Sequence, residues 1–263
     1  MGVHFNHFET ERQAADALYN ELRHHLSVGP EYHAEDDNLQ VAVRTATSPY
    51  VVMLAGGSTP MAVYRRLAGE PPKHVHPAAH LMLSDDRYVD LHDDRSNYHH
   101  IAPLAHALGL PEERLIHVDA TLALDQAVSG FGEQVAEVGR RNGVFALAIL
   151  GIGSDGHTAS LFSAQKATVA TTFSPDTTGT GKLAAYPTDQ LALSTGLHGG
   201  LERVSVGPAV LLAFRKLVFF ATGAGKRDIL YELSRRPEQF PAGQIMLQHP
   251  NSEIWTDEAP RVR

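Results

Sequence analysis

The sequence predicts a single-domain α/β fold, in which a mostly parallel sheet carries helices on both faces. With 263 residues, 43% of them hydrophobic, the chain can bury one large core, and one such domain fits this length better than two small ones. From residue 50 onward, short apolar runs alternate with longer segments of helical period. This alternation is typical of parallel strands joined by helices.

The predicted elements follow in a regular order along residues 1–263. An amphipathic helix is expected over residues 10–26, where Ala14, Leu18 and Leu22 share one helical face. Two polar stretches, 27–48 and 164–200, are expected to be loops or insertions. Six strands are expected from short apolar runs, at Tyr50–Leu54, Leu81–Leu83, Leu115–Val118, Phe145–Leu150, Leu217–Ala221 and Glu253–Thr256.

The composition excludes several classes of function. The formal net charge of -8 leaves no basic excess that could grip nucleic acid or an anionic membrane. The lack of cysteine excludes disulfides and thiolate chemistry, and none of the 16 histidines has a zinc-protease spacing with a glutamate. No signal-peptide pattern or membrane-length apolar run is present. We therefore expect a cytoplasmic protein without metal or cofactor, with neither nucleic acid nor membrane as a partner; its oligomeric state stays open.

The first predicted strand runs into a glycine-rich loop and then into a helical pattern. Gly56 and Gly57 allow close approach of the backbone to an oxyanion, and Ser58 and Thr59 add hydroxyl and amide donors at the start of the helix. The loop predicts a phosphate cradle without the lysine of a nucleotide-binding P-loop. A helix cap that binds no ligand is the alternative.

Cations follow other strands of the predicted sheet. Asp85 and Arg87 come after the second strand, where a guanidinium beside the phosphate loop could hold two phosphate oxygens. Arg203 precedes an apolar helix, and Lys226 lies in the first turn after the Leu217–Ala221 strand, where anions are favoured. A solvated turn and ordinary surface charges are the alternatives.

A third glycine-rich loop follows the most apolar strand and contains Asp155 and His157. A histidine two residues after an aspartate can point into a cleft while the carboxylate orients its ring. His157 is therefore the candidate general base, with a purely structural histidine as the alternative.

Together these loops resemble the motifs of the 6-phosphogluconolactonase family, which shares a Rossmann-like, NagB-type fold with the glucosamine-6-phosphate deaminases. The resemblance covers about residues 50–257, and its most specific block is Asp-Gly-His. The matching motifs are Gly-Gly-Ser-Thr-Pro at 56–60, Asp-Asp-Arg-Tyr-Val at 85–89, Ser-Asn at 96–97, Asp-Gly-His-Thr-Ala-Ser-Leu-Phe at 155–162, Arg-Val-Ser at 203–205 and Gly-Ala-Gly-Lys at 223–226.

The resemblance implies hydrolysis of 6-phospho-D-glucono-1,5-lactone to 6-phosphogluconate, a step of the oxidative pentose phosphate pathway. His157 would deprotonate the attacking water and then protonate the departing ring oxygen, while Asp155 orients it. Asp85 would contact sugar hydroxyls or stabilise its loop. The phosphate of the sugar would be held by Gly56, Gly57, Ser58, Thr59, Arg87, Arg203 and Lys226.

Particular residues separate the two branches of this fold. Deaminases carry Asp-Glu-Tyr at 85–87 and Asn-Glu-Pro at 161–163, where this chain has Asp-Asp-Arg and Leu-Phe-Ser. Phe162 thus replaces the glutamate that assists the deaminase histidine, which favours the lactonase. Within the lactonase pattern, Asp86 stands where glutamate is usual and Ser163 where proline is common.

Two alternatives remain from the sequence. Gln-His-Pro at 248–250 and Asp-Glu-Ala at 257–259 are similar to the tail of the deaminases, so a glucosamine-6-phosphate deaminase is the first alternative. A non-catalytic phosphosugar-sensing domain is the second. It is disfavoured because the segment before the first strand has no room for a helix-turn-helix and a linker.

Overall fold

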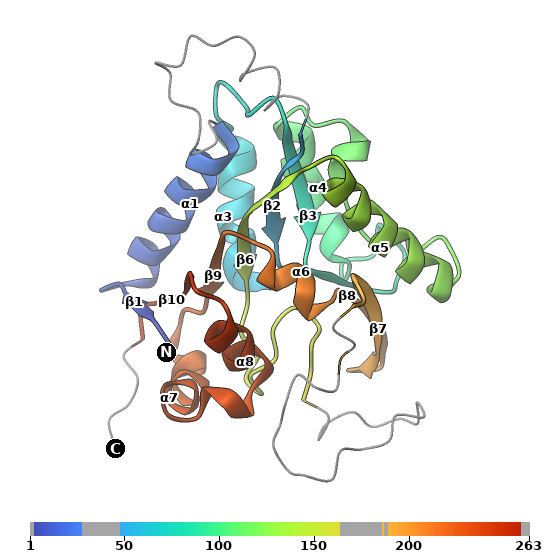
Figure 1. The fold of residues 1–263 in the computed structure, drawn as a ribbon. Helices are drawn as coiled ribbons and strands as arrows, with labels where there is room; N and C mark the ends of the chain where they lie inside the picture. The colour runs from blue at the N-terminus through green and yellow to red at the C-terminus, as the bar shows by residue number, and fades with distance from the viewer. Residues whose placement is uncertain (1–2, 28–47, 164–185, 187–188, 259–263) are drawn as a thin grey trace.

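The computed structural model describes residues 3–27, 48–163, 186 and 189–258, and it confirms the predicted α/β class (Figure 1). Its main sheet has seven strands, and all neighbouring strands run parallel. In spatial order these strands are β1 (Phe5–His7), β10 (Ser252–Thr256), β9 (Lys216–Phe220), β6 (Val144–Leu150), β2 (Tyr50–Leu54), β3 (Ala79–Leu83) and β5 (Leu115–Ile116). All six predicted strands are present, with shifts of one or two residues at half of their ends, whereas β1 was not predicted.

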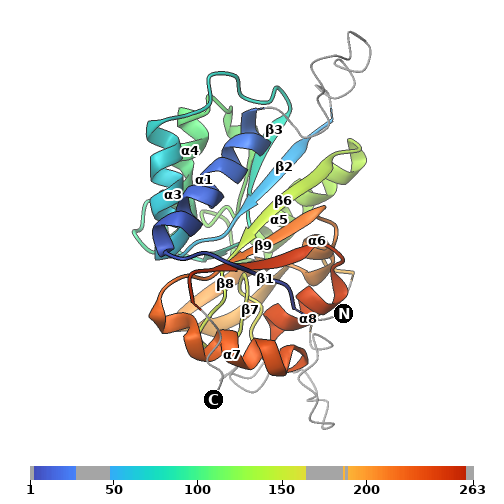
Figure 2. The same ribbon diagram turned by 90° about the vertical axis from the view of Figure 1, so that its left-hand side faces the viewer.

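Helices cover both faces of this sheet (Figure 2). On one face lie α1 (Glu11–Ser27), α3 (Ser58–Gly69) and α4 (Asn97–Ala107). The core on the other face includes residues of α5 (Leu124–Arg140), α6 (Pro208–Leu212), α7 (Arg227–Arg235) and α8 (Pro241–Gln248). In the part of the chain that the structure describes, no helix combines the length and the apolar character needed to cross a membrane.

The side chains of β2 explain why the strands of the main sheet appear in the sequence as continuous apolar runs. Its side chains at Val51 and Met53 belong to the core on one face, whereas Val52 and Leu54 belong to the core on the other. Successive side chains of a strand point to opposite faces, and here both faces are covered by helices. A strand buried on both sides therefore has no polar side to alternate with its apolar one.

A second, antiparallel sheet was not predicted. It consists of β4 (Asp85–Arg87), β8 (Leu201–Val206) and β7 (Ala192–His198), in that spatial order. For residues 192–198 the expectation of one long loop over 164–200 is therefore wrong, because this segment pairs with β8 as a hairpin. Residues 28–47, 164–185 and 187–188, which make up most of the two expected loops, lie outside the described residues.

The order of the parallel strands creates a switch point between β2 and β6. From β2 the chain moves outward to β3 and β5, whereas from β6 it moves in the opposite direction to β9 and β10. The loops that leave these two central strands consequently diverge to opposite sides. In open α/β sheets this divergence opens a crevice at the carboxyl ends of the strands, and ligands bind there.

Candidate active site

A cavity of about 520 Å³ lies at the carboxyl ends of the central strands, among the loops that follow β2, β3, β6 and β9. The structure brings every sequence-predicted site residue to this one cavity. Those that line it are Gly56, Gly57, Ser58, Thr59, Asp85, Arg87, Asp155, His157, Arg203 and Lys226.

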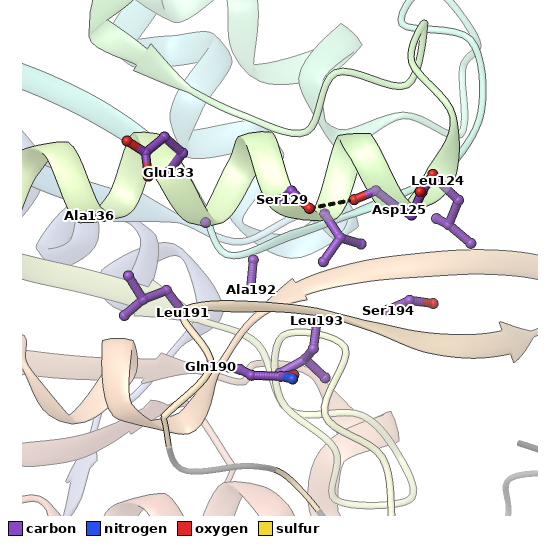
Figure 3. A pocket seen from close by; sticks show the side chains of 12 residues that line it. Leu124, Asp125, Ser129, Glu133, Ala136, Gln190, Leu191, Ala192, Leu193 and Ser194 are labelled. Atoms are coloured by element: carbon purple, nitrogen blue, oxygen red, sulfur yellow. Dashed lines mark hydrogen bonds between the residues drawn. The ribbon is translucent and has the colours of Figure 1, made fainter. Parts of the chain in front are cut away.

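A larger hollow, of about 670 Å³, lies between α5 and β7 and contains none of these residues (Figure 3). Its wall is formed mainly by small and apolar side chains such as Val128, Ala192 and Leu193. Its charged lining residues, Asp125 and Glu133, are both acidic. Because two carboxylates repel an anion, this hollow does not suit a phosphate, and size alone does not identify the functional site.

The glycine-rich loop after β2 places the start of helix α3 at the cavity. Gly57 precedes the helix with a φ of 108°, a conformation that favours glycine, and no side chain caps the helix there. The first N–H groups of an uncapped helix have no partner within the helix, so they can bind an anion. Glycine is also required at position 56, because a Cβ there would overlap the side-chain amide of Asn97.

Arg87 is held by a network that begins at Asp86. The buried Asp86 carboxylate accepts the backbone N–H groups of Asn97 and Tyr98 at 2.6 and 2.9 Å, at the start of α4. Asn97 in turn accepts from Arg87 Nη1 at 2.7 Å, and the carbonyl of Arg95 accepts from the same nitrogen at 3.1 Å. Burial raises the pKa of Asp86 to about 6, although these N–H donors act against the rise. Asp86 therefore supports the loop, while Arg87 reaches the cavity.

Arg203 lies directly opposite Arg87 in the pairing of β4 with β8. Its Nε is buried and has no hydrogen-bond partner within the described residues, while Nη2 donates to the carbonyl of His198 at 3.5 Å. Burial and the charge of Arg87 lower the pKa of Arg203. The charges of Asp85 and Asp86 oppose this effect, but neither arginine forms a salt bridge within the same part of the chain. Two cations held side by side in this way favour an anion between them.

Lys226, in the loop after β9, is a third cation that lines the cavity, and together with Arg87 and Arg203 it forms what we call the cationic wall. Its Nζ donates to the carbonyl of Ile152 at 2.5 Å, which ties this loop to the loop after β6. Burial lowers the pKa of Lys226, and the charge of Asp155 opposes this effect.

His157 and Asp155 form a hydrogen-bonded pair in the loop after β6. His157 Nδ1 and Asp155 Oδ1 are 2.5 Å apart, and the two side chains are 31% and 24% exposed. The hydrogen bond from His157 lowers the pKa of Asp155 to about 2, so this carboxylate is ionised at neutral pH. Gly153 is required beneath the pair, because a Cβ there would overlap the ring of His157.

Asp85 is buried at the wall of the cavity and has two hydroxyl partners. Ser84 donates to one carboxylate oxygen and Ser160 to the other, each at 2.6 Å. Asp85 thus joins the strand that follows β3 to the loop that follows β6.

The site residues predicted from the sequence do not include every residue that lines the cavity; among those missed are Asn97, Phe162 and His198. Asn97 and Phe162 fall within motifs noted from the sequence, but no role was assigned to them in the site. Nothing in the sequence indicates that His198 belongs to the site, because this residue lies in a stretch expected to be a loop or an insertion. Among the described residues there is no cluster of three or more histidine, aspartate or glutamate side chains that could hold a metal ion.

The fold and the cavity define an α/β protein with an anion-accepting wall and a histidine–aspartate pair at the carboxyl ends of parallel strands. Residues 33–255 match the family model described as glucosamine-6-phosphate isomerases/6-phosphogluconolactonase. Because this match spans most of the chain, the protein belongs to that family.

Named relatives come from several bacteria. A 6-phosphogluconolactonase of Haemophilus influenzae is 29% identical over 89% of this chain and 97% of its own. Another, of Synechocystis, is 31% identical over 78% of this chain and 80% of its own.

Solved structures agree with the fold without separating the two branches. The 6-phosphogluconolactonase of Thermotoga maritima matches with a TM-score of 0.67 at 23% identity, covering 97% of this chain and 98% of its own. A monomeric glucosamine-6-phosphate deaminase matches with a TM-score of 0.66 at 14% identity, covering 97% of each chain. The choice between the activities therefore depends on the residues of the site.

Proposed function

We propose that this protein hydrolyses 6-phospho-D-glucono-1,5-lactone to 6-phosphogluconate in the cytoplasm, as a step of the oxidative pentose phosphate pathway. One observation carries the proposal: two pairs of side chains line the same cavity. The His157–Asp155 pair can perform acid–base chemistry, and the Arg87–Arg203 pair can hold a phosphate. The names of the relatives support the same substrate.

In the proposed mechanism, His157 is the general base. Its Nδ1 is engaged by Asp155, so Nε2 is the nitrogen that takes a proton from water. The water oxygen then bonds to the lactone carbonyl carbon. When the bond from that carbon to the ring oxygen breaks, His157 returns the proton to the departing oxygen. The ionised Asp155 stabilises the imidazolium between these two proton transfers.

The phosphate is assigned to the cationic wall and to the start of α3. Arg87 is pre-oriented by Asn97, and the guanidinium of Arg203 lines the same cavity from the neighbouring strand. The phosphate would also neutralise the repulsion between the two guanidinium groups. Binding energy at this distant group positions the lactone carbonyl near His157.

Two features disfavour a deaminase. Both oxygens of Asp85, the residue at the position of the deaminase base, already accept hydroxyl groups. Phe162, in place of the deaminase glutamate, has its ring 4.5 Å from that of His157. No carboxylate of residue 162 is thus present to assist His157 in a ring-opening proton relay.

The deciding experiment compares two reactions of the purified protein. Acid release from freshly made 6-phosphogluconolactone is followed beside the spontaneous hydrolysis, and ammonia release from glucosamine 6-phosphate is followed in parallel. We expect fast acid release and no ammonia. Ammonia release would favour the deaminase, whereas binding of both sugars without any turnover would favour the sensing domain.

A further inference from the structure

His198 occupies a defined place in the cavity although the mechanism above gives it no task. It is the last residue of β7, and Gly199 and Gly200 connect it to β8. Both glycines have positive φ, 61° and 79°, which is the backbone of a tight two-residue hairpin turn. His198 pairs with Leu201 across this turn. The hairpin therefore fixes the backbone of His198 beside the cavity.

The ring of His198 is fixed as well. It stacks on the ring of Phe162, with centroids 3.4 Å apart and planes inclined by 15°. The ring of Phe162 also packs against the ring of His157, with 4.5 Å between the two ring centroids. The backbone N–H and carbonyl of Phe162 are both hydrogen-bonded to the hydroxyl of Tyr186, at 2.8 and 2.9 Å. Three rings thus form a rigid row along the cavity wall, and His198 is its outer member.

The surroundings of His198 favour the neutral form of its ring. Burial lowers its pKa, and the charge of Arg203 acts in the same direction, whereas the backbone of Thr195 and the charge of Asp155 oppose this effect. A neutral imidazole has one N–H donor and one acceptor nitrogen, which matches a sugar hydroxyl. It makes a poor partner for the phosphate itself, which needs donors.

The position of His198 lies between the two ends of the site. Through Phe162 it adjoins His157, and its carbonyl accepts from Arg203 on the neighbouring strand. We infer that His198 is a substrate-recognition residue, whose imidazole hydrogen-bonds a hydroxyl of the sugar between the phosphate and the carbonyl carbon. This inference rests on the proposed function for the identity of the sugar, but its test does not need turnover.

The test measures equilibrium binding by calorimetry for two ligands, 6-phosphogluconate and inorganic phosphate. His198→Phe keeps an aromatic ring on Phe162 and removes the hydrogen bond, so the affinity for 6-phosphogluconate should fall about 3- to 10-fold. The affinity for inorganic phosphate, which has no sugar hydroxyl, should stay unchanged. His198→Gln, which keeps a donor and an acceptor, should recover part of the loss. Leu197→Ser is the control, because this exposed neighbour on the hairpin does not line the cavity.

Equal weakening of both ligands by His198→Phe, or no weakening of either, would overturn the inference. With the lactone as substrate, the same variant should raise KM while kcat stays within about twofold, because His198 contacts a part of the sugar that does not react. If the wild-type protein binds 6-phosphogluconate but does not hydrolyse the lactone, the proposed function fails, and the binding comparison still decides the role of His198.

Discussion

Asn97 accepts a hydrogen bond from Arg87, with 2.7 Å between its Oδ1 and the Nη1 of the arginine. The side-chain nitrogen of Asn97 donates to the carbonyl of Asp85 at 2.9 Å, so the asparagine ties the guanidinium of Arg87 to the backbone at the start of the same strand, β4. The contact leaves the rest of the guanidinium to face the cavity in one orientation. A pre-oriented cation loses less entropy when it binds a phosphate than a mobile one does.

Replacing Arg87 should therefore damage phosphate recognition in particular. For Arg87→Ala we expect a loss of about 10- to 150-fold in kcat/KM on the phosphorylated lactone, since a charge-assisted contact contributes about 1.5–3 kcal/mol. Arg87→Lys should raise KM less, because it keeps the charge and loses only the two-pronged geometry. Plain gluconolactone, measured beside it, should show little change.

A matched control for this series is Arg95→Ala. Arg95 lies in the loop that follows β4, but its side chain is 58% exposed and pairs with Asp93. It should leave both substrates unaffected. If Arg87→Ala slows the two lactones equally, the arginine serves the loop or the chemistry instead of the phosphate.

His157→Gln should lower kcat by at least about 100-fold, as expected for the loss of a general base. The comparison variant is His106→Gln, at an exposed position of α4. Circular dichroism and a thermal unfolding curve would show whether both variants fold. Normal turnover in a folded His157→Gln protein would remove this histidine from the mechanism.

Gly153, beneath the His157–Asp155 pair, offers a purely steric test. Gly153→Ala should displace the ring of His157, because the added methyl group would overlap it. We expect kcat to fall by about 10-fold or more, since catalysis is sensitive to such misplacement. Gly139→Ala, in α5 and outside the cavity lining, meets nothing within 4 Å and has no positive φ, so it should remain close to wild type. Equal activity of the two variants would contradict the geometry of the loop.

Stability at low pH should depend on Glu21, at the opposite end of the sheet. Its carboxylate is 2.9 Å from Lys216 Nζ and 3.5 Å from His25 Nε2. The hydrogen bond from His25, followed by that from Lys216, lowers the pKa of Glu21 to about 2, although burial opposes the change. Because folding lowers this pKa, the ionised carboxylate stabilises the folded state above pH 4.5, and the contribution is lost as the pH falls towards 2.

Urea unfolding of Glu21→Gln at several pH values measures this effect. At pH 7 the variant should be less stable than wild type by up to about 3 kcal/mol, and the difference should shrink between pH 4.5 and pH 2. Glu137→Gln removes a glutamate that is 51% exposed and should cost less than about 1 kcal/mol. A Glu21 difference that does not vary with pH would show that the lost contact is not ionic.

The parts of the site that could be predicted are those encoded locally. Glycines, a histidine and an arginine follow apolar runs directly, so the rule that ligands bind at the carboxyl ends of parallel strands brings them together. Strand β4 could not be predicted, because Asp85–Arg87 is short and polar and becomes a strand only through pairing with the distant β8. His198 was missed for the same reason: its place depends on a hairpin whose sequence, rich in glycine and serine, also suits a loop.

The switch point between β2 and β6 has a consequence for how the protein is made. A chain synthesised from its amino end has completed the glycine-rich loop after β2, Arg87 and His157 soon after β6, but it still lacks Arg203 and Lys226. Strand β4 must also wait for β8 before it can pair. A nascent chain therefore carries reactive groups long before it can retain a phosphate. Its catalytic competence should emerge only when the last quarter of the polypeptide has left the ribosome and closed the cavity.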